Sequence, residues 1–183
     1  MRFQEKQVRL ADGRICVLKS PEPADAQRML DYLKRTAAET HFMLRLPEEV
    51  TMTVEEEISY LESSLKDPGA MMINALVDGE LAGNVGINPQ GLRRKIRHRA
   101  GVGIALVKEY WGMGLGRLLM EEAVRAAAAM GYSQLELGVY GDNERAIRLY
   151  EKLGFEPWGR IRNAFRLPDG TVCDEILMGL LLE

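Results

Sequence analysis

The sequence is poor in the residues that bind metals or form disulfides. Its 183 residues include only two cysteines and two histidines. Cys16 and Cys173 are isolated, each inside a short apolar segment that is typical of a strand. Structural zinc sites and disulfide frameworks need several such residues at regular spacing. The sequence therefore predicts buried, reduced thiols and no metal site.

Long apolar runs and strong net charge are also absent. No stretch approaches the roughly 20 apolar residues of a membrane-spanning helix, and the charged start MRFQEK does not resemble a signal peptide. A formal net charge of −3 and a pI near 5.6 provide no general attraction to nucleic acid or to anionic membranes. We therefore expect a cytoplasmic protein with neither nucleic acid nor membrane as a partner.

Composition and turn signals predict a single domain over residues 1–183. With 46% hydrophobic and 28% charged residues, the chain can bury one sizeable core. Asp-Gly pairs at 12–13, 78–79 and 169–170 separate segments that are typical of strands, and so predict three hairpins. Helical periodicity after the first hairpin, and again from near Thr53, predicts two helices between the first two hairpins.

The most informative stretch is residues 110–117, YWGMGLGR, in which glycine occupies every second position. It follows the apolar, β-branched segment 102–107, which we expect to be a strand buried on both faces. It opens an amphipathic helix, after which Gly131 is suited to a left-handed cap. Free backbone N–H groups and the positive end of the helix dipole would meet here. The pattern predicts a binding site for a phosphate-bearing ligand.

Two familiar phosphate loops do not match this stretch. A P-loop requires a Lys followed by Ser or Thr after its last glycine, and neither is present. A dinucleotide fingerprint requires a third glycine, whereas residues 117–119 are RLL. The acid that should end the following strand is also missing, because Glu136 lies inside that strand.

The remaining pattern predicts the sheet type. Residues 134–140 alternate as a strand does, and a helix capped by Asp142 or Asn143 ends at Gly154. Strand, helix and strand then make one right-handed parallel βαβ unit. Antiparallel hairpins on either side of this unit predict a mixed α/β sheet.

Two segments leave alternatives open. Residues 39–52 have weak periodicity, so they either line a pocket or cover the core. Residues 93–99 contain five Lys or Arg side chains among seven. So short a cluster is usually a solvated turn, and docking of an acidic partner or of a cofactor phosphate is the alternative.

Taken together, residues 111–116 (WGMGLG) and residues 143–155 (NERAIRLYEKLGF) resemble the GCN5-related N-acetyltransferases. The first segment is similar to that family's Arg/Gln-x-x-Gly-x-Gly/Ala pyrophosphate loop, and the second to its Asn…Ala…Tyr…Gly-Phe helix. Their order and separation match, and the element order fits from about residue 14 onward. Trp111 departs from the pattern, because the family often has Arg or Gln there. The backbone cradle does not depend on that side chain.

The resemblance implies a mostly antiparallel central sheet with helices on both faces. Its parallel βαβ unit would be splayed for acetyl-CoA, between strands that end near Lys108 and Tyr140. The resemblance assigns cofactor binding to Leu106, Val107, Lys108, Gly112, Met113, Gly114, Leu115, Gly116, Arg117 and Asn143. Tyr150 would be the general acid beside the thioester sulfur. The structural alternatives are a packed aromatic ring for Tyr150 and a helix cap for Asn143.

The implied activity is acetyl transfer from acetyl-CoA to the primary amine of a small molecule, by direct attack in a ternary complex. An alkylamine with a pKa of about 10.4 must first lose a proton, and a carboxylate or His is the usual acceptor. No pattern selects one base among the candidates Glu109, Glu136, His41, His98, Asp174 and Glu175. The alternatives are a protein N-terminal acetyltransferase of the ribosomal-protein type and a non-catalytic acyl-CoA-binding module. A homodimer is left open.

Overall fold

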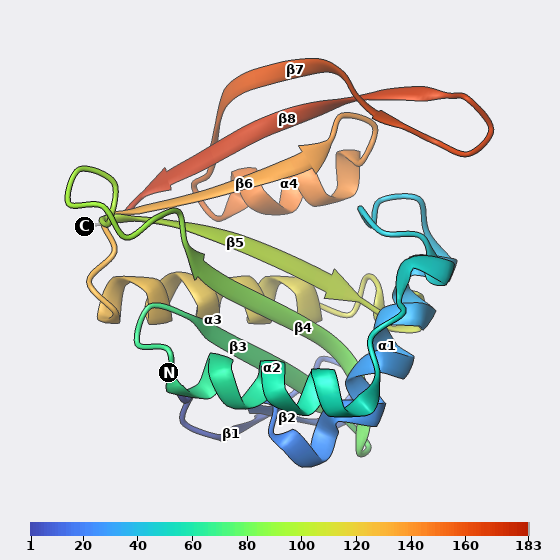
Figure 1. The fold of residues 1–183 in the computed structure, drawn as a ribbon, viewed down its shortest axis with the longest axis vertical. Coiled ribbons are helices and arrows are strands. Elements are labelled where there is room, and N and C mark those ends of the chain that lie inside the picture. Colours follow the sequence, from blue (N-terminus) through green and yellow to red (C-terminus); the bar gives the residue numbers. More distant parts are fainter. Residues whose placement is uncertain (183) are drawn as a thin grey trace.

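The structure of the protein is a computed structural model that describes residues 1–182. These residues form one eight-stranded sheet in the order β1-β2-β3-β4-β5-β6-β8-β7 (Figure 1). The strands are β1 (Lys6–Arg9), β2 (Ile15–Lys19), β3 (Met71–Val77), β4 (Glu80–Pro89), β5 (Arg99–Leu106), β6 (Gln134–Tyr140), β7 (Glu156–Arg166) and β8 (Val172–Leu181). The α-helices are α1 (Ala26–Glu39), α2 (Val54–Lys66), α3 (Leu115–Ala129) and α4 (Glu144–Lys152).

The sheet is mixed, as the sequence predicts. Neighbouring strands are antiparallel throughout the described residues except for β5 and β6, which are parallel and are joined through α3. The predicted βαβ unit and all three Asp-Gly hairpins are therefore confirmed. Gly13, Gly79 and Gly170 have φ between +84° and +90° in the three turns, which is backbone that a side chain rarely adopts.

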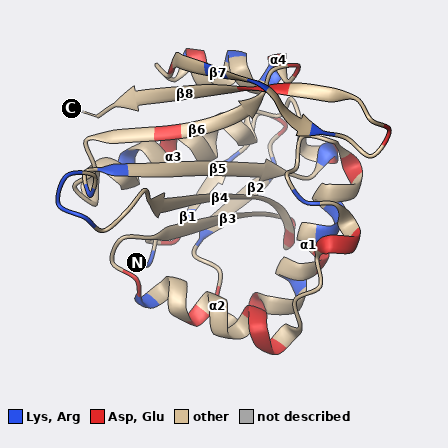
Figure 2. Ribbon diagram, turned by 45° about the horizontal axis from the view of Figure 1, so that its top comes forward, with Lys and Arg blue, Asp and Glu red and all other residues tan. Residues whose placement is uncertain are grey.

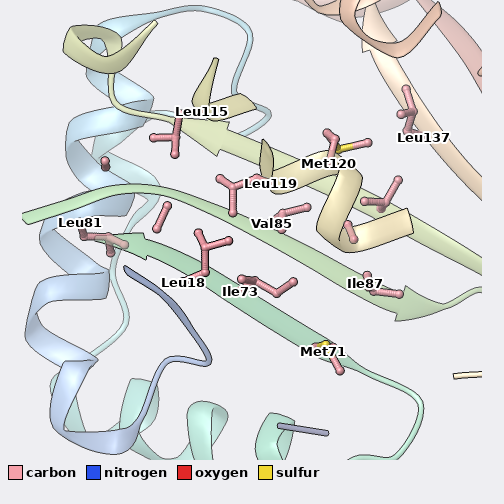
Figure 3. Packing of buried hydrophobic residues seen from close by; sticks show 14 of the residues in the cluster. Leu18, Met71, Ile73, Leu81, Val85, Ile87, Leu115, Leu119, Met120 and Leu137 are labelled. Atoms are coloured by element: carbon pink, nitrogen blue, oxygen red, sulfur yellow. The ribbon is translucent and has the colours of Figure 1, made fainter. Parts of the chain in front are cut away.

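Helices cover both faces of the sheet. On one face, Leu115, Leu119 and Met120 of α3 point onto apolar side chains of β2, β3 and β4 (Figure 3). On the other face lies α1, whose Met29 accepts a hydrogen bond from Asn74 of β3. Because β3 lies between the two layers, nearly all of its residues are buried. The largest part of the core therefore lies in the half of the sheet that contains β1 to β5.

Local signals explain where the helices begin. Thr53 accepts a hydrogen bond from the Glu56 amide (3.2 Å), and Glu56 accepts one from the Thr53 amide (2.8 Å), so α2 starts with a capping box. Asn143 caps α4 by accepting from the Ala146 amide at 3.2 Å. Both helices start where the sequence places them.

Two expectations about burial are wrong. Strand β5 is not buried on both faces, because Gly103 is exposed and Ile104 to Leu106 are half-buried. The reason is that residues 102–106 border a cavity, which leaves this end of β5 only partly covered. Cys16 is buried and its pKa is raised to about 11 by burial, whereas Cys173 is only half-buried. Both thiols are free.

The basic cluster of residues 93–99 lies in the connection between β4 and β5 (Figure 2). This is the start of β5, whereas the glycine stretch follows its end. Eight residues of strand separate the two points by roughly 23 Å. The cluster is therefore remote from the predicted phosphate site, and most of it is exposed. Among residues 1–182, no helix is long and apolar enough to cross a membrane.

Candidate functional site

The candidate site lies where the parallel strands β5 and β6 separate. They pair at only three positions, between Arg99–Gly101 and Gln134–Glu136. Beyond these positions the strands diverge (Figure 1). A cavity of about 650 Å³ occupies this region. It is lined by the glycine segment (within residues 110–117), by helix α4, by residues that follow α1 and by Glu175 of strand β8.

The glycine segment forms a cradle of backbone amides at the start of α3. Gly112 and Gly114 have φ of +80° and +83°, so the turn requires glycine at both positions. The first helical hydrogen bond runs from the Leu118 amide to the Gly114 carbonyl at 3.0 Å. The amides of residues 115–117 therefore have no helical acceptor, and the positive end of the α3 dipole adds to their field. Such a cradle suits phosphate oxygens.

Side chains in the cradle point away from the cavity or lie at its edge. Leu115 is fully buried in the core, and the Met113 sulfur accepts a hydrogen bond from Arg14 (3.2 Å). Gly112, Gly114 and Gly116 line the cavity together with Arg117. Arg117 is largely exposed and pairs with Glu121 at 2.7 Å. The residues between the glycines can therefore contribute only their backbone groups.

The three residues before the cradle, Leu106, Val107 and Lys108, differ in the hydrogen bonds that their backbone groups make. Leu106 lines the cavity, and its carbonyl accepts a hydrogen bond from the Trp111 indole at 3.0 Å. The Val107 amide instead donates to the Ala82 carbonyl at 3.0 Å. The Lys108 amide donates to a Glu39 carboxylate oxygen at 2.6 Å. These last two amides are thus already occupied within the protein.

Trp111 and Arg145 form a stacked pair beside the cradle, which no sequence signal predicted. The Arg145 guanidinium carbon lies 3.5 Å from the centre of the Trp111 ring, a cation–π contact. Within residues 1–182, no carboxylate lies within ion-pairing distance of Arg145, and burial lowers its pKa. A partly buried cation without a counter-charge next to an amide cradle is suited to binding an anion.

Helix α4 brings Asn143 and Tyr150 to the same cavity. Asn143 has its side chain engaged as the helix cap. Tyr150 is 8% exposed and packs against Phe155, with a centroid separation of 6.0 Å. Burial raises the pKa of Tyr150 to about 12, so its hydroxyl stays protonated at any ordinary pH.

The other end of the cavity has an aromatic wall, which we define as Phe42, Tyr140 and Phe165. Tyr140 stacks on Phe165 at 3.9 Å and meets Phe42 edge-on at 5.9 Å. Glu175 of β8 lines the cavity beside this wall. Of the two alternatives for residues 39–52, lining a pocket is therefore the one observed for Thr40, Phe42, Met43 and Leu44. The wall was not predictable as a unit, because its rings come from three distant segments.

Residues after α1 also make contact across the open end of the sheet. His41 Nε2 and Asp142 Oδ2 are 2.9 Å apart, which joins this segment to the loop after β6. The His41 ring also lies against Phe42 and Tyr140. The contact between His41 and Asp142 therefore bridges the cavity between the segment after α1 and the loop after β6.

A mixed sheet opened between two parallel strands, with a glycine cradle at the head of the intervening helix, defines the acyl-CoA N-acyltransferase fold. Comparison with known proteins agrees. The family model described as the acetyltransferase (GNAT) family matches residues 27–155. The chain belongs to this family.

Individual relatives differ in what they are named for. The L-amino acid N-acetyltransferase AaaT of Escherichia coli is 30% identical over 112 residues, which cover 61% of this chain and 68% of that protein. The ribosomal protein bS18-alanine N-acetyltransferase of the same species is 39% identical over 77 residues, covering 42% and 51%.

Solved structures show the same fold. A GNAT-family acetyltransferase from Streptococcus pneumoniae superimposes with a TM-score of 0.86 at 32% identity, covering 91% of this chain and 99% of that one. The yncA protein of Salmonella typhimurium, determined with its cofactor acetyl-CoA, has a TM-score of 0.80 at 18% identity, with coverage of 92% and 94%. At that identity the likeness concerns the fold alone.

Proposed function

We propose that this protein transfers the acetyl group of acetyl-CoA to the primary amine of a small molecule, by direct attack in a ternary complex. Family membership supports the acetyl transfer. The cavity that continues from the amide cradle to the aromatic wall supports a complex of two substrates. Neither cysteine lines this cavity, which favours direct transfer over a cysteine-bound intermediate.

The residues present fit acetyl-CoA. Its pyrophosphate would accept hydrogen bonds from the amides of residues 112–117, where the glycines allow close approach. Its extended arm would lie between β5 and β6, where the strands leave backbone groups unpaired. In this proposal Leu106 contributes its backbone to the arm, and Asn143 lies beside it. Val107 and Lys108 are the other residues predicted to hold the arm, but their amides already donate to Ala82 and Glu39.

Arg145 extends the proposed cofactor site. Its guanidinium, held on the Trp111 ring, would supply a full positive charge beside the cradle. This charge comes from helix α4 rather than from the first position of the glycine loop, which Trp111 occupies. The site would thereby combine backbone dipoles with one side-chain cation.

The chemistry requires three contributions from the chain. An N–H donor directed at the developing oxyanion is worth roughly 3 kcal/mol in acyl transfer. A hydrogen-bond donor must stabilise the departing sulfur, and Tyr150 lines the cavity from α4 for that role. A proton acceptor must also convert the ammonium form of the acceptor to the free amine.

A small acceptor is favoured over a protein N-terminus by the bridge between His41 and Asp142. An extended peptide that entered along the aromatic wall would have to displace this contact. The protein N-terminal alternative is supported by the likeness to the ribosomal-protein enzyme. A non-catalytic module is the third possibility.

The test is release of free thiol from acetyl-CoA across a panel of polyamines, amino acids, aminoglycosides, arylamines and N-terminal peptides. Calorimetry with acetyl-CoA is run in parallel. We expect binding, and release that depends on a small amine. Preference for peptides would favour the protein-acetylating alternative. Binding without release would favour the non-catalytic module, and failure to bind acetyl-CoA would contradict the cofactor assignment.

A further inference from the structure

The acidic groups and histidines near the site differ in whether they are already engaged. Most of the six candidate bases have a partner of opposite charge. The pairs are Glu136 with Arg99, Glu109 with Arg35, Asp174 with Arg160 and His41 with Asp142. His98 lies at the start of β5, at the far end of the strand from the cradle. Glu175 alone among these six both lines the cavity and has no cationic partner within 4.0 Å in residues 1–182.

The position of Glu175 depends on a glycine in the neighbouring strand. Glu175 pairs with Tyr140 across β8 and β6. Its carboxyl group lies over the backbone of Gly138, so that a Cβ on Gly138 would collide with the Oε1 atom. Gly138 follows Glu136, the last residue of β6 that pairs with β5. The carboxylate therefore lies directly at the place where the sheet opens.

Around this carboxylate the cavity is suited to an organic cation. Phe42, Tyr140 and Phe165 offer ring faces and edges next to it, and aromatic faces attract ammonium groups. The Lys and Arg residues that line the cavity come from α3 and α4, on the cradle side. Negative charge and aromatic surface thus meet at one end, and positive charge gathers at the other.

We propose that Glu175 is the catalytic base, and that it binds the acceptor as an ammonium ion and then takes its proton. This inference rests on the proposed acetyl transfer. One proton moves from the ammonium nitrogen to a Glu175 oxygen, which frees the nitrogen lone pair. That pair forms the bond to the acetyl carbon, and the carbon–sulfur bond breaks with its electrons on sulfur. As the amide forms, the nitrogen loses a second proton, which neutralises the thiolate to give the free thiol of coenzyme A. Glu175 then returns its own proton to solvent.

The test compares two amines of similar shape in the full-length protein. 2-Phenylethylamine is an ammonium ion at neutral pH, whereas phenylhydrazine is largely unprotonated. Glu175→Gln should lower kcat/KM for 2-phenylethylamine about 100-fold or more, which is the usual contribution of a general base. The loss for phenylhydrazine should be much smaller, and the Kd for acetyl-CoA should be unchanged. Equal losses for both amines, or a variant as active as the wild type, would overturn the proposal.

Two further variants separate the role of Glu175 from an effect of fold or charge. Glu156→Gln removes one carboxylate from an exposed position in the adjacent strand β7, and it should leave both amines unaffected. Gly138→Ala keeps the charge but forces the Glu175 carboxyl from its place. It should reproduce the selective loss for 2-phenylethylamine. A Gly138→Ala enzyme with unaltered selectivity would contradict the proposed geometry.

A binding measurement tests the ammonium-binding part of the proposal independently of turnover. Calorimetry follows 2-phenylethylamine binding to the protein saturated with coenzyme A. We expect affinity in the wild type and in Glu156→Gln, and a loss of about tenfold in Glu175→Gln, the usual scale of one charged hydrogen bond. If no amine is acetylated, the proposed function fails, but this measurement still tests Glu175. Equal affinity in all three proteins, or none in the wild type, would overturn the role of Glu175.

Discussion

At the scale of single residues, burial decides what Tyr150 can contribute. Its pKa is raised to about 12 by burial, whereas an alkyl thiol such as that of cysteine has a pKa of about 8.5. Complete proton transfer from the phenol to a thiolate would then be uphill by roughly 3.5 pK units, or about 5 kcal/mol. A phenol that keeps its proton still donates a hydrogen bond. We therefore expect Tyr150 to stabilise the departing sulfur chiefly as a hydrogen-bond donor.

Replacing Tyr150 with Phe tests this role. The variant removes only the hydroxyl and leaves the packing against Phe155. We expect kcat to fall about 100-fold, the usual cost of removing one hydrogen-bond donor to a developing negative charge, with little change in the Kd for acetyl-CoA. Steady-state kinetics and calorimetry provide the two values. Unchanged turnover would show that the hydroxyl has no part in the reaction, and Tyr60→Phe, at an exposed position in α2, serves as the control.

Gly114 has a backbone conformation on which the proposed phosphate cradle depends. Its φ of +83° costs a residue with a side chain about 1–2 kcal/mol. Gly114→Ala should lower stability by about that amount and should also weaken acetyl-CoA binding, because relaxation of the turn would redirect the cradle amides. Gly131→Ala, with φ of +86° at the other end of α3, should cost similar stability without loss of binding. Urea denaturation and calorimetry distinguish the two effects.

At the scale of elements, α4 contributes charge to a cradle built on α3. Arg145 and Arg148 lie on the same helix, but Arg148 pairs with Glu144 at 2.8 Å, whereas Arg145 stacks on Trp111. Arg145→Gln should weaken acetyl-CoA binding about tenfold, the usual scale for a charged hydrogen bond. It should not affect acetyl-pantetheine, which has no pyrophosphate. Because Arg148 lines the same cavity, the control is Arg94→Gln in the exposed loop before β5, and equal effects of Arg145→Gln and Arg94→Gln would exclude a specific role for Arg145.

Elements were predictable from the sequence where the signal is local. Asp-Gly turns, the capping residues Thr53 and Asn143, and the glycines of residues 112–116 act within a few positions of the chain. The cradle was therefore predictable together with the helix that it opens. The exposure of one face of β5 was not predictable, because an apolar segment has the same composition whether it packs against a helix or lines a cavity.

The far end of the cavity was not predictable for a related reason. The aromatic wall and Glu175 lie on four segments, and only the sheet order brings them together. Nothing in the residues around Glu175 distinguishes it from Asp174, its neighbour in sequence. The difference is that alternate strand positions face opposite sides, and that Gly138 leaves room for one of the two carboxylates.

At the scale of the whole molecule, the buried carboxylate of Glu122 links the first strand to the central helix. Glu122 of α3 is 5% exposed and contacts both Lys6 of β1 and Arg125. Burial raises the pKa of Glu122, but the hydrogen bonds from Lys6 and Arg125 outweigh burial and lower it below 4.5. A carboxyl whose pKa is lowered by folding stabilises the folded state above its unfolded pKa. That contribution is lost as the pH falls through the folded pKa.

Glu122→Gln should therefore have a stability cost that depends on pH. At neutral pH, we expect the variant to lose about 1–2 kcal/mol, because the Glu122 carboxylate is buried but its partners Lys6 and Arg125 are exposed enough to be solvated. The difference from the wild type should shrink as the pH falls below about 4.5. Urea denaturation across this range measures it. Glu144→Gln, at an exposed pair, should change stability by less than about 1 kcal/mol, and a pH-independent cost for Glu122→Gln would contradict the assignment.

The two ends of the cavity are encoded in the chain in different ways. The cradle is one uninterrupted stretch, residues 110–117, whereas the aromatic wall and Glu175 are scattered between residues 42 and 175. Single substitutions at the scattered positions therefore change one end of the cavity without altering the chain of the cradle. Relatives named for amino acids and for a ribosomal protein share this family. Under the proposed function, a change of acceptor would thus require no change in residues 110–117.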